Sequence, residues 1–93
     1  MVECRVTIVN RLGLHARAAA KLVRTASGFR SAVRLERADR GGAADAKSIL
    51  SVLVLAAARG TELRIVAAGA DEREALDAVC ALFEQGFGEE VVA

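Results

Sequence analysis

The sequence contains no proline, tryptophan or tyrosine, only one histidine and two cysteines, and no long apolar run. Its longest uninterrupted apolar segment is 52–58, which is far too short for a transmembrane helix. The first residues, Met1–Arg5, show no basic segment followed by an apolar one, so we expect no export signal and a cytoplasmic protein. Two cysteines and one histidine are too few for a disulfide framework or a typical zinc site, so we expect no metal. Cys4 and Cys80 fall at inward-facing positions of their segments, and we expect both to be buried free thiols.

Charge is divided unevenly between the two halves of the chain. Residues 1–40 hold nine lysine and arginine residues against three acidic ones, whereas residues 41–93 hold four against nine. Nucleic acid is a poor match to the basic half, because Phe29 is its only aromatic residue and bases would find no stacking platforms. A positive rim around the single histidine, His15, suits a phosphate group and acidic protein partners instead. The residues of this rim are Arg11, Arg17, Lys21 and Arg24, of which the last two also fit a solvated helix face.

The hydrophobic pattern predicts a single small domain, residues 1–93, with the order β-α-β-β-α-β-α. Alternation of apolar and polar residues predicts strands at 2–8, 29–36 and 62–67, with a short, weak strand at 43–46. Helical spacing predicts helices from His15 to Ser27, from Ser48 towards Arg59-Gly60, and from Asp71 to about Gly86. Asp71 and Glu74 fit a capping box at the start of the last helix. The expected fold is therefore α+β: an open-faced β-sandwich, with a four-stranded antiparallel sheet covered on one face by three helices.

His15 stands where the first strand gives way to the first helix. This N-cap position normally carries Ser, Thr, Asn or Asp, whose side chain accepts from a free backbone N–H. With a histidine there, we expect the N–H groups of the first turn to remain available and, together with the helix dipole, to form an anion site. A nucleophilic ring, free N–H groups and the neighbouring guanidinium of Arg17 therefore predict a histidine that accepts and holds a phosphoryl group.

The sequence lacks the parts that would make this histidine a self-sufficient enzyme. A hydrolase needs a base and an orienting group around its nucleophile, yet there is no second histidine and no Gly-x-Ser-x-Gly turn. No glycine-rich loop of the Walker type is present to bind a nucleotide. We therefore expect a phosphoryl-group carrier rather than a kinase, with no cofactor.

The segment after Lys47 is apolar on nearly all sides, so its pattern fits a buried strand as well as a helix. Ser48 as an N-cap favours a short helix. Burial of one face would leave part of Ile49, Leu50 and Leu53 exposed, and an exposed apolar patch on a small domain often marks a docking surface. Full burial against the sheet is the alternative for about half of these side chains.

Three segments resemble HPr, the histidine phosphocarrier family of the bacterial phosphotransferase systems. They are residues 10–21, which contain the motif Gly-Leu-His-Ala-Arg, the segment Lys47-Ser48-Ile49, and the ending 78–90. The resemblance extends over nearly the whole chain and implies that enzyme I phosphorylates His15 on Nδ1. It further implies that Arg17 stabilises the phosphoryl group, that the backbone N–H groups of Ala16 and Arg17 bind it, and that enzyme II A-type domains receive it.

The same resemblance implies a regulatory site and a docking surface. Ser48 matches the serine that HPr kinase/phosphorylase modifies in some bacteria, and a plain N-cap without regulation is the alternative. Docking on enzyme I and on enzyme II A-type domains is assigned by the resemblance to Ala20, Arg24, Ile49, Leu50 and Leu53. Neither nucleic acid nor a membrane is implied as a partner, and we expect a monomer.

Two features depart from the usual sugar-transport members of the family. Ala18 stands where most of them carry proline; since alanine is the best helix former, we expect little structural loss. The alanine-rich segment 15–20 and the segment 81–87 are more similar to NPr, the carriers of the nitrogen-related branch. The resemblance therefore favours that branch, although many bacteria use one such protein for both purposes.

Two functions of other classes also fit parts of the pattern. A non-catalytic regulatory or ligand-binding domain of the βαββαβ kind would leave His15 incidental, so that His15→Ala would retain function. A basic RNA-binding module would show salt-sensitive RNA affinity centred on Arg17, Lys21 and Arg24. The carrier is the interpretation that explains the histidine, the arginine and the helix start together.

Overall fold

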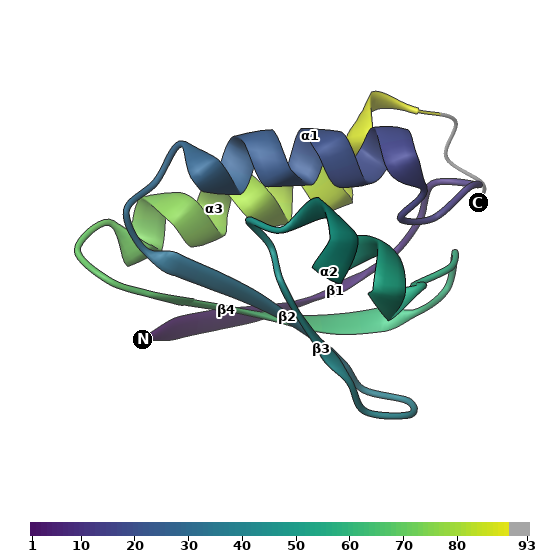
Figure 1. The fold of residues 1–93 in the computed structure, drawn as a ribbon, viewed down its shortest axis with the longest axis horizontal. Coiled ribbons are helices and arrows are strands. Elements are labelled where there is room, and N and C mark those ends of the chain that lie inside the picture. The colour runs from purple at the N-terminus through teal and green to yellow at the C-terminus, as the bar shows by residue number, and fades with distance from the viewer. Residues whose placement is uncertain (90–93) are drawn as a thin grey trace.

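The computed structural model describes residues 1–89, and its elements follow the predicted order (Figure 1). The strands are β1 (Val2–Thr7), β2 (Ala32–Arg37), β3 (Ala43–Asp45) and β4 (Glu62–Ala68). The helices are α1 (Ala16–Ser27), α2 (Ile49–Leu55), α3 (Glu72–Glu84) and the 3-10 turn η1 (Gly86–Gly88), which the sequence did not predict. Glu90, with which the segment resembling HPr ends, lies outside the described residues. Within residues 1–89, no helix has the length and apolar character needed to cross a membrane.

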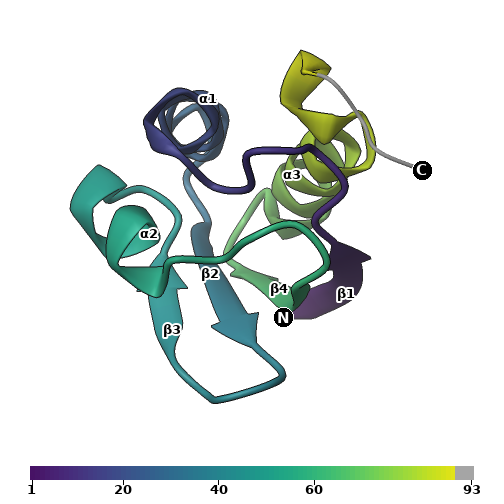
Figure 2. The same ribbon diagram turned by 90° about the vertical axis from the view of Figure 1, so that its right-hand side faces the viewer.

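The sheet has the order β1-β4-β2-β3, and every neighbouring pair of strands is antiparallel. Its register aligns Cys4, Ile65, Leu35 and Ala44 in one row across the four strands. Figure 2 shows the helices on one face of this sheet, with α2 on the side of β3 and α3 on the side of β1, while the other face is open. The predicted open-faced α+β sandwich is therefore confirmed.

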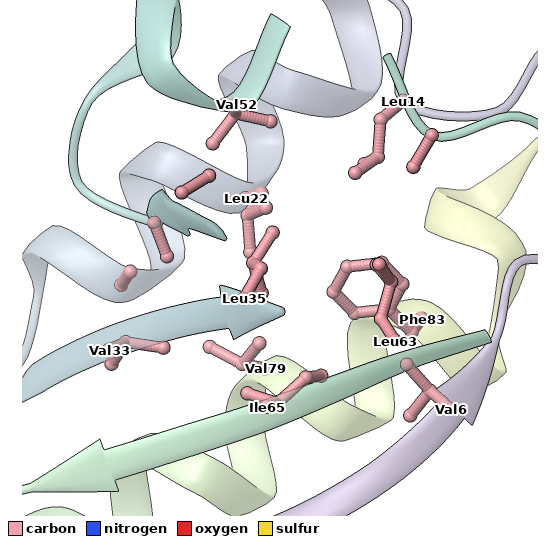
Figure 3. Close-up of a cluster of buried hydrophobic side chains, with 14 of the residues drawn as sticks. Val6, Leu14, Leu22, Val33, Leu35, Val52, Leu63, Ile65, Val79 and Phe83 are labelled. Carbon is pink, nitrogen blue, oxygen red and sulfur yellow. The ribbon is translucent and has the colours of Figure 1, made fainter. Parts of the chain in front are cut away.

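An apolar core joins the helices to the sheet (Figure 3). The side chains at its centre are at most 2% exposed; they are Leu22, Val33, Leu35, Val52, Leu63, Ile65, Val79 and Phe83. Full burial of such a side chain stabilises the folded state by about 1.5–3 kcal/mol. The core therefore fixes the three helices on the sheet, and Leu14, directly before His15, is also buried in it.

The prediction of free thiols is wrong. Cys4 of β1 and Cys80 of α3 are joined in a disulfide, and both residues are only partly buried. They do lie at the interface of their elements, because α3 packs on β1. Hydrophobic periodicity identifies the inward face of each segment, but it does not tell which residues meet between segments 76 positions apart.

Helix α2 ends earlier than the predicted stop at Arg59-Gly60. Its last residue is Leu55, and Ala56 follows in a left-handed conformation with a φ of 53°. The Arg37 guanidinium explains this end, because it donates hydrogen bonds to the carbonyl oxygens of Leu55 and Ala56 at 3.0 and 3.2 Å. The last carbonyls of a helix need such partners from outside the helix.

Asp71 precedes α3 as predicted but does not form the capping box with Glu74. Its side chain makes no capping bond and accepts instead from the Ser31 hydroxyl and from the backbone N–H groups of Arg30 and Ser31. These bonds hold the chain just before β2, which explains why that strand begins at Ala32, later than predicted. The hydrogen bonds from Ser31 and Arg30 lower the pKa of the Asp71 carboxyl to about 2, so the group is ionised at neutral pH.

Candidate functional site

A tight loop after β1 holds His15 at the start of α1. Asn10 is fully buried in this loop, and its side-chain amide donates to the Gly13 carbonyl at 2.8 Å. Gly13 has a φ of +65°, which glycine adopts at little cost. The backbone N–H of Leu14 donates to the carbonyl of Ala57 at 3.0 Å. These contacts fix the backbone immediately before His15.

His15 is itself the N-cap of α1, with an extended backbone (φ −75°, ψ 179°). Its carbonyl accepts from the Ala19 N–H at 2.8 Å, and its ring Nδ1 accepts from the Arg17 N–H at 3.3 Å. The prediction that the first-turn N–H groups remain free is therefore wrong for Arg17. An unprotonated ring nitrogen is an acceptor, and Nδ1 takes the part that a hydroxyl or carboxylate oxygen usually plays.

The opposite ring nitrogen, Nε2, contacts Glu89, a residue that the sequence did not single out. Nε2 lies 3.0 and 2.8 Å from the two carboxylate oxygens of Glu89. The Glu89 side chain is 13% exposed and the His15 side chain 26%. Because the two residues are 74 positions apart, no local pattern connects them.

The electrostatics of this contact define the tautomer of the ring. Burial alone would raise the pKa of the Glu89 carboxyl, but hydrogen bonds from Asn10 and His15 and the nearby charge of Lys21 lower it below its ordinary value. The ionised carboxylate only accepts hydrogen bonds, so Nε2 of His15 is the donor. In the tautomer with the proton on Nε2, the lone pair lies on Nδ1, which accepts from the Arg17 N–H.

Glu89 reaches His15 because η1 turns the chain back towards the start of α1 after α3 (Figure 1). Phe87 anchors this turn: it is buried, has a φ of +58°, and its ring centroid lies 4.9 Å from that of Phe83. Lys21 of α1 donates to the Phe87 carbonyl. The end of α3 is thereby tied to the helix that His15 caps.

Glu89 also lines a cleft of about 300 Å³. The other lining residues are Arg11, Leu12, Arg17, Lys21 and Gly88. Three of the four cations in the predicted positive rim thus face one cleft, whereas Arg24 is exposed on α1 outside it. Within residues 1–89, the Arg17 guanidinium makes no hydrogen bond or ion pair, which leaves it available to an anion. The same residues hold no cluster of three or more side chains able to ligate a metal.

The predicted apolar patch lies on the exposed side of α2. Ile49, Leu50 and Leu53 are 45%, 69% and 38% exposed, so the alternative of burial against the sheet is wrong for all three. Val54 and Leu12, which the sequence did not single out, are exposed as well. We call the three α2 residues and Val54 the α2 patch.

The remaining predicted residues lie on α1 and at the start of α2. Ser48 is the N-cap of α2, and its hydroxyl accepts from the Ser51 N–H at 3.3 Å. Ala20 is partly buried and Arg24 is exposed on α1, which packs beside α2. The residues assigned to docking by resemblance therefore belong to two neighbouring helices.

Comparison with known proteins shows a consistent set of relatives. The family model described as "PTS HPr component phosphorylation site" matches residues 2–85. The phosphocarrier protein HPr of Cupriavidus necator is 47% identical over 89 residues, which cover 96% of this chain and 98% of that protein. The phosphocarrier protein NPr of Proteus mirabilis is 48% identical over 86 residues, which cover 92% and 94%. The crystal structure of HPr from Thermoanaerobacter tengcongensis has a TM-score of 0.90 at 41% identity, covering 98% of this chain and all of that one.

The fold, the histidine at the helix start and these relatives define a small phosphocarrier. The chain belongs to the HPr family of the bacterial phosphotransferase system, in which both HPr and NPr proteins are its relatives. Sequence identity alone does not separate the two branches, because the HPr and NPr relatives are almost equally similar.

Proposed function

We propose that this phosphocarrier accepts a phosphoryl group on Nδ1 of His15 from phosphorylated enzyme I, which obtains it from phosphoenolpyruvate. It then passes the group to enzyme II A-type domains. The observation that carries this proposal is the orientation of the ring. Nε2 is occupied by Glu89 at 2.8 Å, whereas Nδ1 faces the first turn of α1, 3.3 Å from the Arg17 nitrogen. Nδ1 is therefore the nitrogen that presents a lone pair to an incoming group.

The start of α1 is suited to hold the group once it is bound. When the bond from Nδ1 to phosphorus forms, Nδ1 can no longer accept from the Arg17 N–H, and this donor becomes available to a phosphoryl oxygen. The Ala16 N–H and the positive end of the helix dipole favour the same anion. The Arg17 guanidinium, which has no partner among residues 1–89, adds a charge-assisted donor. Because the His15 side chain is 26% exposed, the group stays accessible to the next acceptor.

Partner docking is assigned to the α2 patch together with the basic residues near His15. The exposed apolar side chains of α2 and the three cations that line the cleft complement partner surfaces that are apolar and acidic, respectively. Ala18 is fully buried within α1, so alanine keeps this helix intact where most sugar-system relatives carry proline. We favour the nitrogen-related branch, because segments 15–20 and 81–87 resemble NPr more than they resemble the sugar-transport members of the family.

Intact-mass spectrometry after incubation with phosphoenolpyruvate and enzyme I tests this function. Enzyme I of the sugar branch and enzyme I of the nitrogen branch are used in separate reactions, each with its own carrier as a positive control. We expect the gain of one acid-labile phosphoryl group, which fragmentation locates on His15, followed by its loss to an added enzyme II A-type domain. The faster donor identifies the branch. No gain with either active donor would contradict the proposal.

We expect Ser48→Asp to slow the phosphorylation of His15 by enzyme I. Aspartate is a good N-cap, so α2 is retained, but a negative charge beside the α2 patch repels an acidic partner. Exposed charges interact by up to about 1 kcal/mol, which corresponds to a slowing of about two- to fivefold. Ser48→Asn is the matched control, since it caps the helix without charge. Equal initial rates for Ser48→Asp and the control would count against regulation by charge at this position.

A further inference from the structure

The contact of Glu89 with Nε2 of His15 joins the loop after β1 to the last described residue of the chain. Its distance of 2.8 Å is that of a charge-assisted hydrogen bond. The amide of Asn10 donates to Glu89 Oε1 at 3.1 Å and to the Gly13 carbonyl at 2.8 Å. The carboxylate is thus held by a buried residue of the same loop that positions His15.

We propose that Glu89 is a positioning residue that keeps the proton on Nε2 of His15 both before and after Nδ1 is phosphorylated. The inference rests on the proposed function of His15 as the phosphoryl acceptor. A carboxylate on one ring nitrogen fixes the tautomer of a histidine and stabilises the positive ring that forms when the other nitrogen reacts. The family model matches residues 2–85, so Glu89 lies outside it.

The transfer balances without any movement of this proton. In the accepting step, the Nδ1 lone pair forms a bond to phosphorus while the bond from phosphorus to the donor protein breaks, and its electron pair stays on the donor. The ring of His15 is then positively charged, with Nε2–H facing Glu89. In the donating step, the Nδ1–phosphorus bond breaks, its electron pair returns to Nδ1, and neutral imidazole is the leaving group. Loss of the Nε2 proton beforehand would make the leaving group an imidazolate anion, which leaves far less readily.

The surrounding charges make Glu89 the group that favours a positive ring. Arg11 from the loop and Arg17 and Lys21 from α1 line the same cleft, and these cations oppose a positive charge on His15. Helix α2 contributes no charged side chain. Among the described residues that line this cleft, only Glu89 has the opposite sign. Its carboxylate therefore keeps the phosphorylated ring protonated and the phosphoryl group transferable.

Phosphoramidate, a small phosphoryl donor, allows a test that does not depend on enzyme I. The wild type, Glu89→Gln, Glu89→Ala and the matched control Glu84→Gln are phosphorylated with it. Glu84 is exposed on α3, and its replacement removes the same charge away from the ring. Phosphorus and nitrogen NMR locate the group on Nδ1 or Nε2, and the rate of phosphoryl loss is followed from acidic to alkaline pH.

We expect the phosphoryl group on Nδ1 alone, with the same pH–rate profile, in the wild type and Glu84→Gln. The glutamine of Glu89→Gln still accepts from Nε2–H, so Nδ1 remains the site of phosphorylation. As the pH is raised, however, the rate of phosphoryl loss begins to decrease at a lower pH than in the wild type. At neutral pH we expect phosphoryl loss from Glu89→Gln to be about tenfold slower than from the wild type. This factor corresponds to the difference in strength between a hydrogen bond to a charged acceptor and one to a neutral acceptor. Glu89→Ala lacks both the acceptor that fixes the proton on Nε2 and the negative charge that stabilises the positive ring. We therefore expect the same change in the pH–rate profile and, in addition, some product phosphorylated on Nε2.

Profiles of both Glu89 variants that coincide with the wild type would overturn the inference, because a merely structural contact leaves the pH dependence unchanged. Should Glu89→Ala fail to fold, the isosteric Glu89→Gln decides the question by its profile. If the phosphoramidate results are as expected but enzyme I does not phosphorylate the wild type, the proposed function fails while the role of Glu89 in holding the Nε2 proton stands.

Discussion

His15→Ala is expected to abolish phosphoryl acceptance from enzyme I while the protein remains folded. The imidazole supplies the nucleophilic nitrogen, and no other histidine is present in the chain to replace it. Its side chain is partly exposed and makes two structural contacts: a capping bond of 3.3 Å to the Arg17 N–H, and a contact of 2.8 Å from Nε2 to the Glu89 carboxylate, which the variant leaves without this partner. Loss of a helix N-cap costs about 1 kcal/mol, which a small domain tolerates. Intact-mass spectrometry measures acceptance, and urea unfolding measures stability.

His15→Asn separates the chemical role from the capping role. Asparagine is among the best N-cap residues, so this variant retains the start of α1 while it lacks a nucleophilic ring. We expect it to be at least as stable as His15→Ala and equally unable to accept a phosphoryl group. If either variant gained an acid-labile phosphoryl group at the wild-type rate, His15 would be incidental. A regulatory or ligand-binding domain would then be a better interpretation than a carrier that is phosphorylated on His15.

The fold is largely predictable from the sequence because each element buries one face. Alternation placed β1 and β4 correctly, and even the three-residue strand β3 was expected at its observed position. The ends of elements were less predictable, since they depend on partners far along the chain. Arg37 terminates α2, and Asp71 holds the chain before β2; neither partner is within reach of a local pattern.

The candidate site shows the same division between local and long-range information. The strand-to-helix switch and the motif Gly-Leu-His-Ala-Arg led to His15 and Arg17, which are neighbours in sequence. Glu89 was missed because its approach depends on η1, where Phe87 takes a left-handed backbone that glycine or asparagine usually occupies. The disulfide between Cys4 and Cys80 was missed for a similar reason, since pairing across β1 and α3 is a property of the packed fold.

Gly13→Ala is expected to destabilise the protein by about 2–5 kcal/mol and to displace His15. The left-handed backbone at φ +65° costs about 1–2 kcal/mol for a residue with a Cβ atom. A Cβ at this position would also lie 2.7 Å from the Ala57 carbonyl oxygen and 2.9 Å from the Ala58 Cα. Both neighbours are backbone atoms, so relief requires movement of the loop itself, and such overpacking costs about 1–3 kcal/mol more.

Gly41→Ala is the matched control for Gly13→Ala, because its φ of +72° is nearly the same and nothing lies within 4 Å of the added Cβ. We expect this control to lose only the backbone term of about 1–2 kcal/mol in urea unfolding. Phosphorylation by enzyme I should be slowed in Gly13→Ala and unchanged in the control, since Gly13 alone belongs to the loop that Asn10 and Ala57 hold before His15. Equal destabilisation of the two variants would mean that the close approach of the β1–α1 loop to Ala57 does not fix the position of the phosphoryl acceptor.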